Sequence, residues 1–313
     1  MFFLLLVLCY VKFAETKLVK EAIQRWKHDI NCFSQGIALH DDPSKAHLLY
    51  ESCGAMQGSS SIREMDLRSG KTTKTLEIGG GYFTEDITIH KGVLYALTYE
   101  NETLLAFNVN NDMQLLGTKR YEGEGWGLTH DGTSLIHSNG TNILKYYDIP
   151  YDFSTTSENA LKKRTEVEVY DSLTVGHPHF KVNGINALAF VNGFVYANLW
   201  VRDFIMKISP TSGVVVDHFD VAPLRPDNVE IDVCANGVVY DSLQKRFIVT
   251  GVFCSVWCSV VWVCVIYIVC VDLSLHSQPT IHNHRFREYS VGYMEYSVGY
   301  REYSVGYREY SVG

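Results

Sequence analysis

The sequence predicts an all-β protein, a five-bladed β-propeller whose last blade is incomplete. Three observations support this: a segment with a fixed order of short strands recurs along the chain, Asp-Gly, Lys-Gly or Asn-Gly turns separate many of the strands, and no long segment has helical periodicity. A period of about 40–50 residues holding four strands is typical of propeller blades. Asn-Gly and Asp-Gly turns between alternating strands indicate hairpins.

The repeats begin with strands centred, in order, on Ile37, Ile87, Leu128, Leu188 and Val238. Each first strand is followed by a polar turn, a second strand, a loop and a third strand, and most repeats add a fourth strand such as "KTLEI" or "VVVDHF". The insertion "PYDFSTTSENALKKRTEV" lengthens the third repeat. A β-sandwich with accidental self-similarity is the alternative, but it does not explain why strand order and spacing recur together.

Composition limits the classes of function. The formal net charge of −8 argues against nucleic acid as a partner, because phosphate contacts need a basic surface. The 20 tyrosines and 24 glycines, with only 7 prolines, fit β-structure.

The first 16 residues, "MFFLLLVLCYVKFAET", predict a signal peptide and therefore a secreted protein, although a basic start is missing. Two sequons, at Asn101 and Asn139, predict N-glycosylation on that route. The body of the chain holds three cysteines and no Cys-x-x-Cys pair, so the sequence predicts no metal site. Cys32 and Cys53 are either a disulfide or buried free thiols.

The C-terminal region departs from the repeat pattern. We predict a propeller domain over 30–251, an apolar segment of uncertain nature over 252–271, and a low-complexity tail over 272–313 in which "EYSVG" recurs every seven residues. The apolar segment is long enough to cross a membrane, which makes a membrane-anchored protein the alternative to a secreted one. Read-through into noncoding sequence, or a novel soluble ending, would also account for this region.

Six motifs follow one another along the chain: "FSQGIAL", "YESCGAMQGSSSIREMDLRSGK", "YFTEDITIHKGVLYALTYE", "GEGWGLTHDG", "INALAFVNGFVYANLW" and "ANGVVYDSLQKRFIVTG". In this order they resemble the motifs of plant-type glutaminyl-peptide cyclotransferases, the glutaminyl cyclases. The resemblance runs from Phe33 to Gly251. It implies a five-bladed propeller that converts the N-terminal glutamine of peptides or proteins to pyroglutamate, with release of ammonia and without a catalytic metal or other cofactor.

The resemblance also implies a set of site residues. The family's cavity carboxylate is assigned to Glu51, which would act as the catalytic proton shuttle. The substrate-binding residues assigned by motif are Phe33, Gln35, Trp126, Asn186 and Trp200. A carboxyl group in an apolar cavity can take a proton from the α-amine and return it to ammonia, and side-chain amides can hold the oxyanion.

Each of these residues could instead have an ordinary structural role. Glu51 could cap a strand or pair with Arg63, and tryptophans are often core residues. The pair His177 and His179 lacks a third metal ligand in the sequence.

Three departures from the family pattern weaken the assignment of activity. Asp86 stands where the family has glycine, and Ala187 and Ala189 stand where it has glutamates. The family's cavity lysine would fall near Val252 and is missing. The alternative function is therefore a catalytically inactive propeller that binds peptides or serves as an interaction module.

Overall fold

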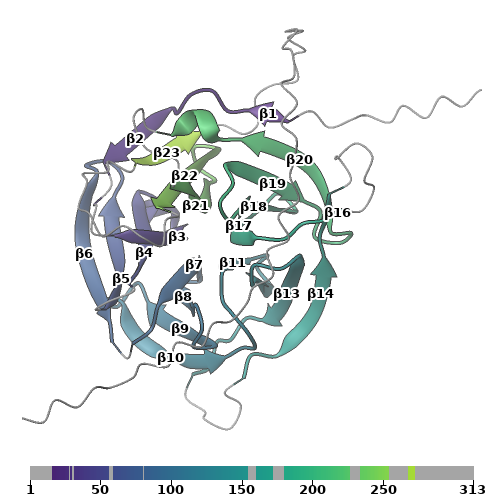
Figure 1. Cartoon of the computed structure of the whole chain (residues 1–313). Coiled ribbons are helices and arrows are strands. Elements are labelled where there is room, and N and C mark those ends of the chain that lie inside the picture. Colours follow the sequence, from purple (N-terminus) through teal and green to yellow (C-terminus); the bar gives the residue numbers. More distant parts are fainter. Residues whose placement is uncertain are drawn as a thin grey trace, which may run out of the picture. The chain divides into compact units, whose positions relative to one another are not determined.

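Five mainly antiparallel sheets are arranged in a ring in the computed structural model, which confirms the five-bladed propeller (Figure 1). The structure describes residues 16–27, 29, 32–55, 59–79, 81–153, 160–171, 180–225, 233–253 and 267–271. The predicted signal peptide lies outside these residues except for Thr16, and the predicted tail lies wholly outside them.

The first three blades each use four consecutive strands. Blade 1 contains β3 (Phe33–Leu39), β4 (Leu48–Gly54), β5 (Ser60–Asp66) and β6 (Lys71–Ile78). Blade 2 contains β7 (Thr84–His90), β8 (Val93–Thr98), β9 (Thr103–Asn108) and β10 (Gln114–Arg120). Blade 3 contains β11 (Gly127–His130), β12 (Ser134–Ser138), β13 (Ile143–Asp148) and β14 (Lys163–Glu168).

Blade 4 is wider than the others. Its four main strands are β17 (Ile185–Val191), β18 (Phe194–Leu199), β19 (Phe204–Ile208) and β20 (Val214–Asp220). The short strands β1 (Lys17–Leu18), β15 (Tyr170–Asp171) and β16 (Phe180–Lys181) extend its outer edge. Two 3-10 turns complete the described elements, η1 (Pro43–Lys45) and η2 (Ala222–Leu224).

The tight turns follow the sequence signal. Lys91-Gly92 joins β7 to β8 and Asn192-Gly193 joins β17 to β18, and all four residues have positive φ angles. Two consecutive positive φ angles define the type I′ turn, whose twist matches that of the strands that it connects.

Blade 5 has four strands, so the prediction of an incomplete last blade was wrong. It contains β21 (Val233–Asp241), β22 (Arg246–Phe253), β23 (Tyr267–Val271) and β2 (Gln24–Lys27). The N-terminal strand β2 pairs antiparallel with β23 and supplies the outer edge (Figure 1). The propeller therefore extends beyond both ends of the predicted span 30–251, because strand pairing joins segments that are far apart in the sequence.

Both ends of the apolar segment 252–271 are part of blade 5. Its first two residues end β22 and its last five form β23, while residues 254–266 lie outside the described part. Among the described residues, none of the helices has the length and apolar character that crossing a membrane requires.

Five apolar clusters fill the spaces between neighbouring blades. The cluster between blades 5 and 1 joins Trp26 and Ile248 to Ile37, Leu49 and Met65. The other four lie between successive blades around the ring. Each blade is thus buried on both faces, and the fifth cluster closes the ring.

Candidate active site

Four of the five inner strands carry a β-bulge near their first residues. The register shifts between Ser34 and Gly36 in β3, between Thr84 and Ile87 in β7, between Ile185 and Leu188 in β17, and between Ala235 and Val238 in β21. A bulge inserts a residue without a regular ladder partner and redirects its side chain. The residues that the bulges contain include Gln35, Glu85, Asn186 and Asn236.

Together with Trp126, which directly precedes β11, these residues form what we call the inner-strand set: Gln35, Glu85, Trp126, Asn186 and Asn236. Each blade contributes one member, at the end where its innermost strand begins. The family motifs assigned Gln35, Trp126 and Asn186 to the site but not Glu85 or Asn236. The spacing of the repeats could have identified Glu85 and Asn236, because every member of the set lies two residues before the centre of the first strand in its repeat.

The three amide side chains of the set are joined by hydrogen bonds across three blades. The Nδ2 of Asn236 donates to Oε1 of Gln35 over 3.0 Å and to the backbone carbonyl of Ser34 over 3.1 Å. The Nδ2 of Asn186 donates to Oδ1 of Asn236 over 3.1 Å. All three amides are buried. The structure therefore brings Gln35 and Asn186 together, through a residue that no motif had assigned.

Glu85 is the buried carboxyl group of the inner-strand set. Burial raises its pKa well above the usual range, and the nearby carboxylates of Asp86 and Glu124 add to this effect. The backbone carbonyl of Glu124 accepts a hydrogen bond from Nε2 of His137, so the segment that leads to Trp126 is fixed close to Glu85. A carboxyl group with a raised pKa keeps its proton to higher pH and can act in proton transfer.

Asp86, the first departure from the family pattern, connects three blades. Its carboxylate accepts hydrogen bonds from the backbone N–H groups of Ile87, Leu128 and Leu188, at 2.9, 2.9 and 3.0 Å. A Cβ at Gly36 would lie 2.1 Å from its Oδ1, so only glycine fits there in blade 1. Asp86 is therefore a structural link at the centre of the ring.

The three aromatic residues that the motifs assigned contact other aromatic rings. The rings of Trp126 and Trp200 meet edge to face with centroids 5.6 Å apart, and the exposed fraction of Trp200 is 47%. Phe33 meets Phe83 edge to face at 6.2 Å. Phe33 and Trp126 are partly buried. The three predicted aromatic residues thus keep part of their surface accessible, as a wall that faces a substrate requires.

Glu51 lies elsewhere. It is paired in regular register with Ile37 of β3 and Arg63 of β5, on the same face of β4 as Leu49 and Cys53. Because Leu49 belongs to the cluster between blades 5 and 1, this face points between blades. A carboxylate oxygen of Glu51 lies within 4.8 Å of the sulfur atoms of Cys32 and Cys53. The structure thus places Glu51 in an inter-blade position and does not bring it into the inner-strand set.

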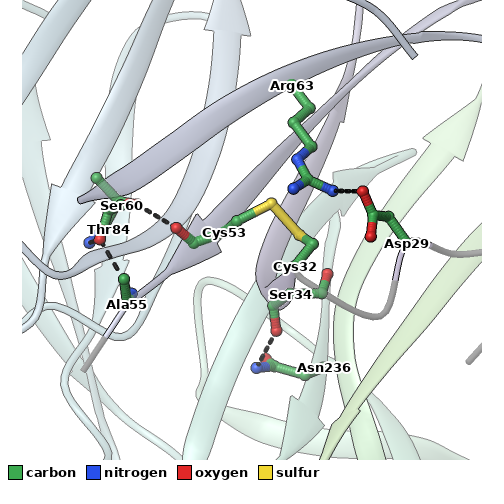
Figure 2. The surroundings of a disulfide bond; sticks show 9 residues. All are labelled: Asp29, Cys32, Ser34, Cys53, Ala55, Ser60, Arg63, Thr84 and Asn236. Carbon is green, nitrogen blue, oxygen red and sulfur yellow. Dashed lines mark hydrogen bonds and ion pairs between the residues drawn. A yellow bond between two sulfur atoms is a disulfide. The ribbon is translucent and has the colours of Figure 1, made fainter. Parts of the chain in front are cut away.

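Cys32 and Cys53 form a disulfide, which decides between the two states that the sequence left open. Figure 2 shows the surroundings of this disulfide. Arg63 forms an ion pair with Asp29 next to the disulfide, with Nη1 and Oδ2 2.8 Å apart. The Nδ2 of Asn236 donates to the backbone carbonyl of Ser34, which follows Cys32 closely in the chain.

Among the described residues, Cys32, Cys53 and Glu51 are the only group with the composition and spacing of metal ligands. The disulfide consumes both thiolates, so this group does not fit a metal in its oxidised form. His177 and His179 lie outside the described residues.

The remaining departures from the family pattern concern blades 4 and 5. Ala187 and Ala189 are buried in the apolar cluster that includes Val238, where a glutamate side chain would lie among apolar groups. Val252 lies in β22 opposite Cys234, and that strand contains no lysine. Valine therefore stands at the position for which the family pattern predicts a cation.

A separate cavity of about 330 Å³ lies where the inner strands end. Its lining includes Thr88, Thr129, Phe190 and Tyr240. None of the inner-strand set contributes to this lining, so the cavity is distinct from the candidate site.

The fold and site together define a β-propeller with a buried carboxyl group, linked amides and accessible aromatic rings at the start of its inner strands. Residues 8–261 match the family model described as glutamine cyclotransferase. The chain belongs to the glutamine cyclotransferase family.

Two relatives support the same assignment. A glutaminyl-peptide cyclotransferase of Arabidopsis thaliana is 29% identical over 236 residues, which cover 74% of this chain and 67% of the relative. The crystal structure of Myxococcus xanthus glutaminyl cyclase matches with a TM-score of 0.60 and 25% identity, over 82% of this chain and 100% of that chain.

Proposed function

We propose that this protein is a glutaminyl-peptide cyclotransferase, which converts the N-terminal glutamine of peptides or proteins to pyroglutamate and releases ammonia. The observation that supports this most strongly is the inner-strand set, in which a carboxyl group with a raised pKa lies at the same level as three linked amides and a tryptophan. Membership of the glutamine cyclotransferase family supports the same reaction.

In this reaction the substrate α-amine attacks the carbonyl carbon of its own γ-carboxamide. A new N–C bond closes the five-membered ring, the bond from that carbon to the amide nitrogen breaks, and ammonia leaves. One proton must move from the attacking nitrogen to the leaving nitrogen. A single carboxyl group between the two nitrogens can carry that proton, first as base and then as acid.

We assign that role to Glu85, with the amides of Gln35 and Asn186 orienting the γ-carboxamide. Burial raises the pKa of Glu85, which favours the protonated form that must give a proton to the leaving ammonia. Trp126, Trp200 and Phe33 would cover the substrate and exclude water, so that ring closure proceeds faster than hydrolysis. Glu51, the carboxylate assigned from the family motif, would instead support the structure between blades 5 and 1.

The two carboxylates can be separated by one pair of variants. We expect Glu85→Gln to lower kcat for a Gln-initiated dipeptide by at least a hundredfold, since proton transfer typically contributes about 10²–10⁴-fold. Glu51→Gln should retain kcat within about threefold and lower the unfolding midpoint instead. Coupled detection of ammonia measures the turnover, and circular dichroism checks the fold. Loss of turnover in Glu51→Gln, with Glu85→Gln active, would reverse the two assignments.

We also propose that the reaction needs no metal or other cofactor. The mechanism uses only proton transfer and hydrogen bonding, which carboxyl and amide groups supply. Turnover should therefore be unchanged after prolonged dialysis against a chelator. Restoration of lost activity by a divalent cation would contradict this proposal.

We propose in addition that the protein is secreted and carries N-glycans at Asn101 and Asn139. Its expected partners are peptides or proteins that start with glutamine. The side chain of Asn101 is exposed, whereas Oδ1 of Asn139 accepts a hydrogen bond from Thr141 at 2.6 Å. Because Asn101 is exposed and Asn139 is partly buried, Asn101 is the more accessible acceptor of the two. Expression in a secreting cell, with glycosidase treatment of medium and membrane fractions, distinguishes secretion from anchoring.

A further inference from the structure

Asn236 has a position in the inner-strand set but no role in the proposed reaction. It lies in the bulge of β21, and its exposed fraction is only 2%. Its side chain makes three hydrogen bonds, to Ser34, Gln35 and Asn186, and so joins blades 5, 1 and 4. A buried amide with this many partners across blade boundaries is expected to fix the geometry of its neighbours.

The polarity of this amide chain is set by one backbone group. The carbonyl of Ser34 can only accept a hydrogen bond, so the group of Asn236 that faces it must be the NH₂ group. Consequently Oδ1 of Asn236 faces Asn186, and only the NH₂ group of Asn186 can donate to it. The same NH₂ group of Asn236 requires the carbonyl end of Gln35 on its other side.

Fixing the polarity leaves one acceptor without a partner. The Oδ1 of Asn186 is buried and has no hydrogen-bond partner among the described residues, and the exposed fraction of Asn186 is 4%. An unpaired buried acceptor costs free energy unless a ligand supplies a donor. The complementary ligand group is one that offers N–H and carries no negative charge.

We propose that Asn236 is a positioning residue that makes the site select a γ-carboxamide over a γ-carboxylate, by holding Oδ1 of Asn186 as an acceptor. A glutamine side chain donates its amide N–H to this oxygen. A glutamate side chain at neutral pH places a negative oxygen against it, with no proton to share. This inference rests on the proposed cyclisation and names the basis of its substrate preference.

The test compares binding of two ligands that differ only at this group. A Gln-initiated dipeptide is the substrate, and the same dipeptide starting with glutamate is the competitive inhibitor at pH 7, so the readout is the ratio of Ki to KM. In Asn236→Ala, the Asn186 amide is free to rotate and present its NH₂ group. We expect the ratio to fall by on the order of tenfold, because the carboxylate gains a donor and the carboxamide loses its acceptor.

Two further variants distinguish positioning from general damage. Asn198→Ala removes a similar amide, whose Nδ2 donates to the carbonyl of Ala235 next to Asn236 over 2.6 Å, and should leave the ratio unchanged. Asn236→Asp still accepts from Asn186 and should keep most of the preference, although it cannot donate to Ser34. An equal fall in the ratio for Asn198→Ala, or an unchanged ratio in Asn236→Ala, would overturn the proposal.

The positioning role of Asn236 can also be tested if the protein does not catalyse cyclisation. If the wild-type protein releases no ammonia, titration calorimetry with the same two dipeptides measures the preference directly. A wild-type preference for the glutamine peptide that Asn236→Ala removes would support the positioning role without turnover. Equal binding of both peptides by the wild type would overturn it. If Asn236→Ala does not fold, Asn236→Asp carries the test, and loss of the preference in that variant would contradict the proposal.

Discussion

Asp86 shows how a side chain that departs from the family pattern is built into the fold. Its carboxyl oxygens accept hydrogen bonds from N–H groups of β7, β11 and β17 at the centre of the ring. Burial raises the pKa of Asp86 to about 8, although the three hydrogen bonds oppose this shift. The aspartate is therefore accommodated as a link between blades.

This raised pKa predicts a pH dependence of stability. Between about pH 4 and pH 8 the unfolded chain has released the Asp86 proton while the folded protein retains it, so the free energy of unfolding falls as pH rises. The slope contributed by one group is at most about 1.4 kcal/mol per pH unit. Glu85 contributes with the same sign. Urea unfolding of the wild type and of Asp86→Asn at several pH values measures the contribution of Asp86 to the pH dependence of the free energy of unfolding. Parallel profiles would contradict this prediction.

Gly140 lies against the Trp126 ring. Its φ is +76°, and a Cβ there would lie 2.7 Å from the Trp126 ring. We expect Gly140→Ala to move Trp126 away from Trp200 and raise KM for a Gln-initiated dipeptide several-fold. Gly193→Ala is the matched control, because its φ is +80° but nothing lies within 4 Å of the added atom. If both variants raise KM equally, backbone strain and not the tryptophan is responsible.

At the scale of the strand, the bulges decide which side chains belong to the candidate site. Periodicity located the first strand of each repeat correctly, because alternation of apolar residues is a local property. Whether a strand is regular or bulged depends on how it pairs with its neighbour. Glu51 lies in a regular part of β4 and faces between blades, whereas Glu85 lies in a bulge. The motif pointed to Glu51, and only the strand pairing shows that Glu85 lies in a bulge.

The pairing of Cys32 with Cys53 also depends on how two strands meet. Cys32 directly precedes β3, and Cys53 lies in β4, which pairs antiparallel with β3. A disulfide requires the two Cα atoms to lie close together. Their separation follows from the register of this hairpin, so the sequence alone could not decide between a disulfide and two thiols.

Around the complete ring, the closing contact is the cluster between blades 5 and 1. Trp26 of β2 is buried there, and its Nε1 donates to the carbonyl of Leu67 over 2.7 Å. The N-terminal strand thus links the last blade to the first. A chain whose fifth blade looked incomplete can close because its missing edge comes from the other end of the sequence.

We expect Trp26→Ala to destabilise the protein by about 3–5 kcal/mol, since it removes a large buried side chain and a buried hydrogen bond. Equilibrium unfolding in urea measures this loss. Trp200→Ala, which removes a side chain that is 47% exposed, should cost much less. Equal unfolding free energies for Trp26→Ala and wild type would show that the ring does not depend on β2 for closure.

Local sequence information was sufficient for the five repeats and their hairpin turns, and the motifs also pointed to Gln35, Trp126 and Asn186, which the structure places in the inner-strand set. These follow from periodicity, turn chemistry and motif. The tertiary structure was needed to place Glu85 and Asn236 in bulges at the same level, to place Glu51 in a regular part of β4, and to show that β2 completes blade 5. Bulge geometry, hydrogen-bond polarity and ring closure are properties of paired strands, and the order of residues along one strand does not specify them.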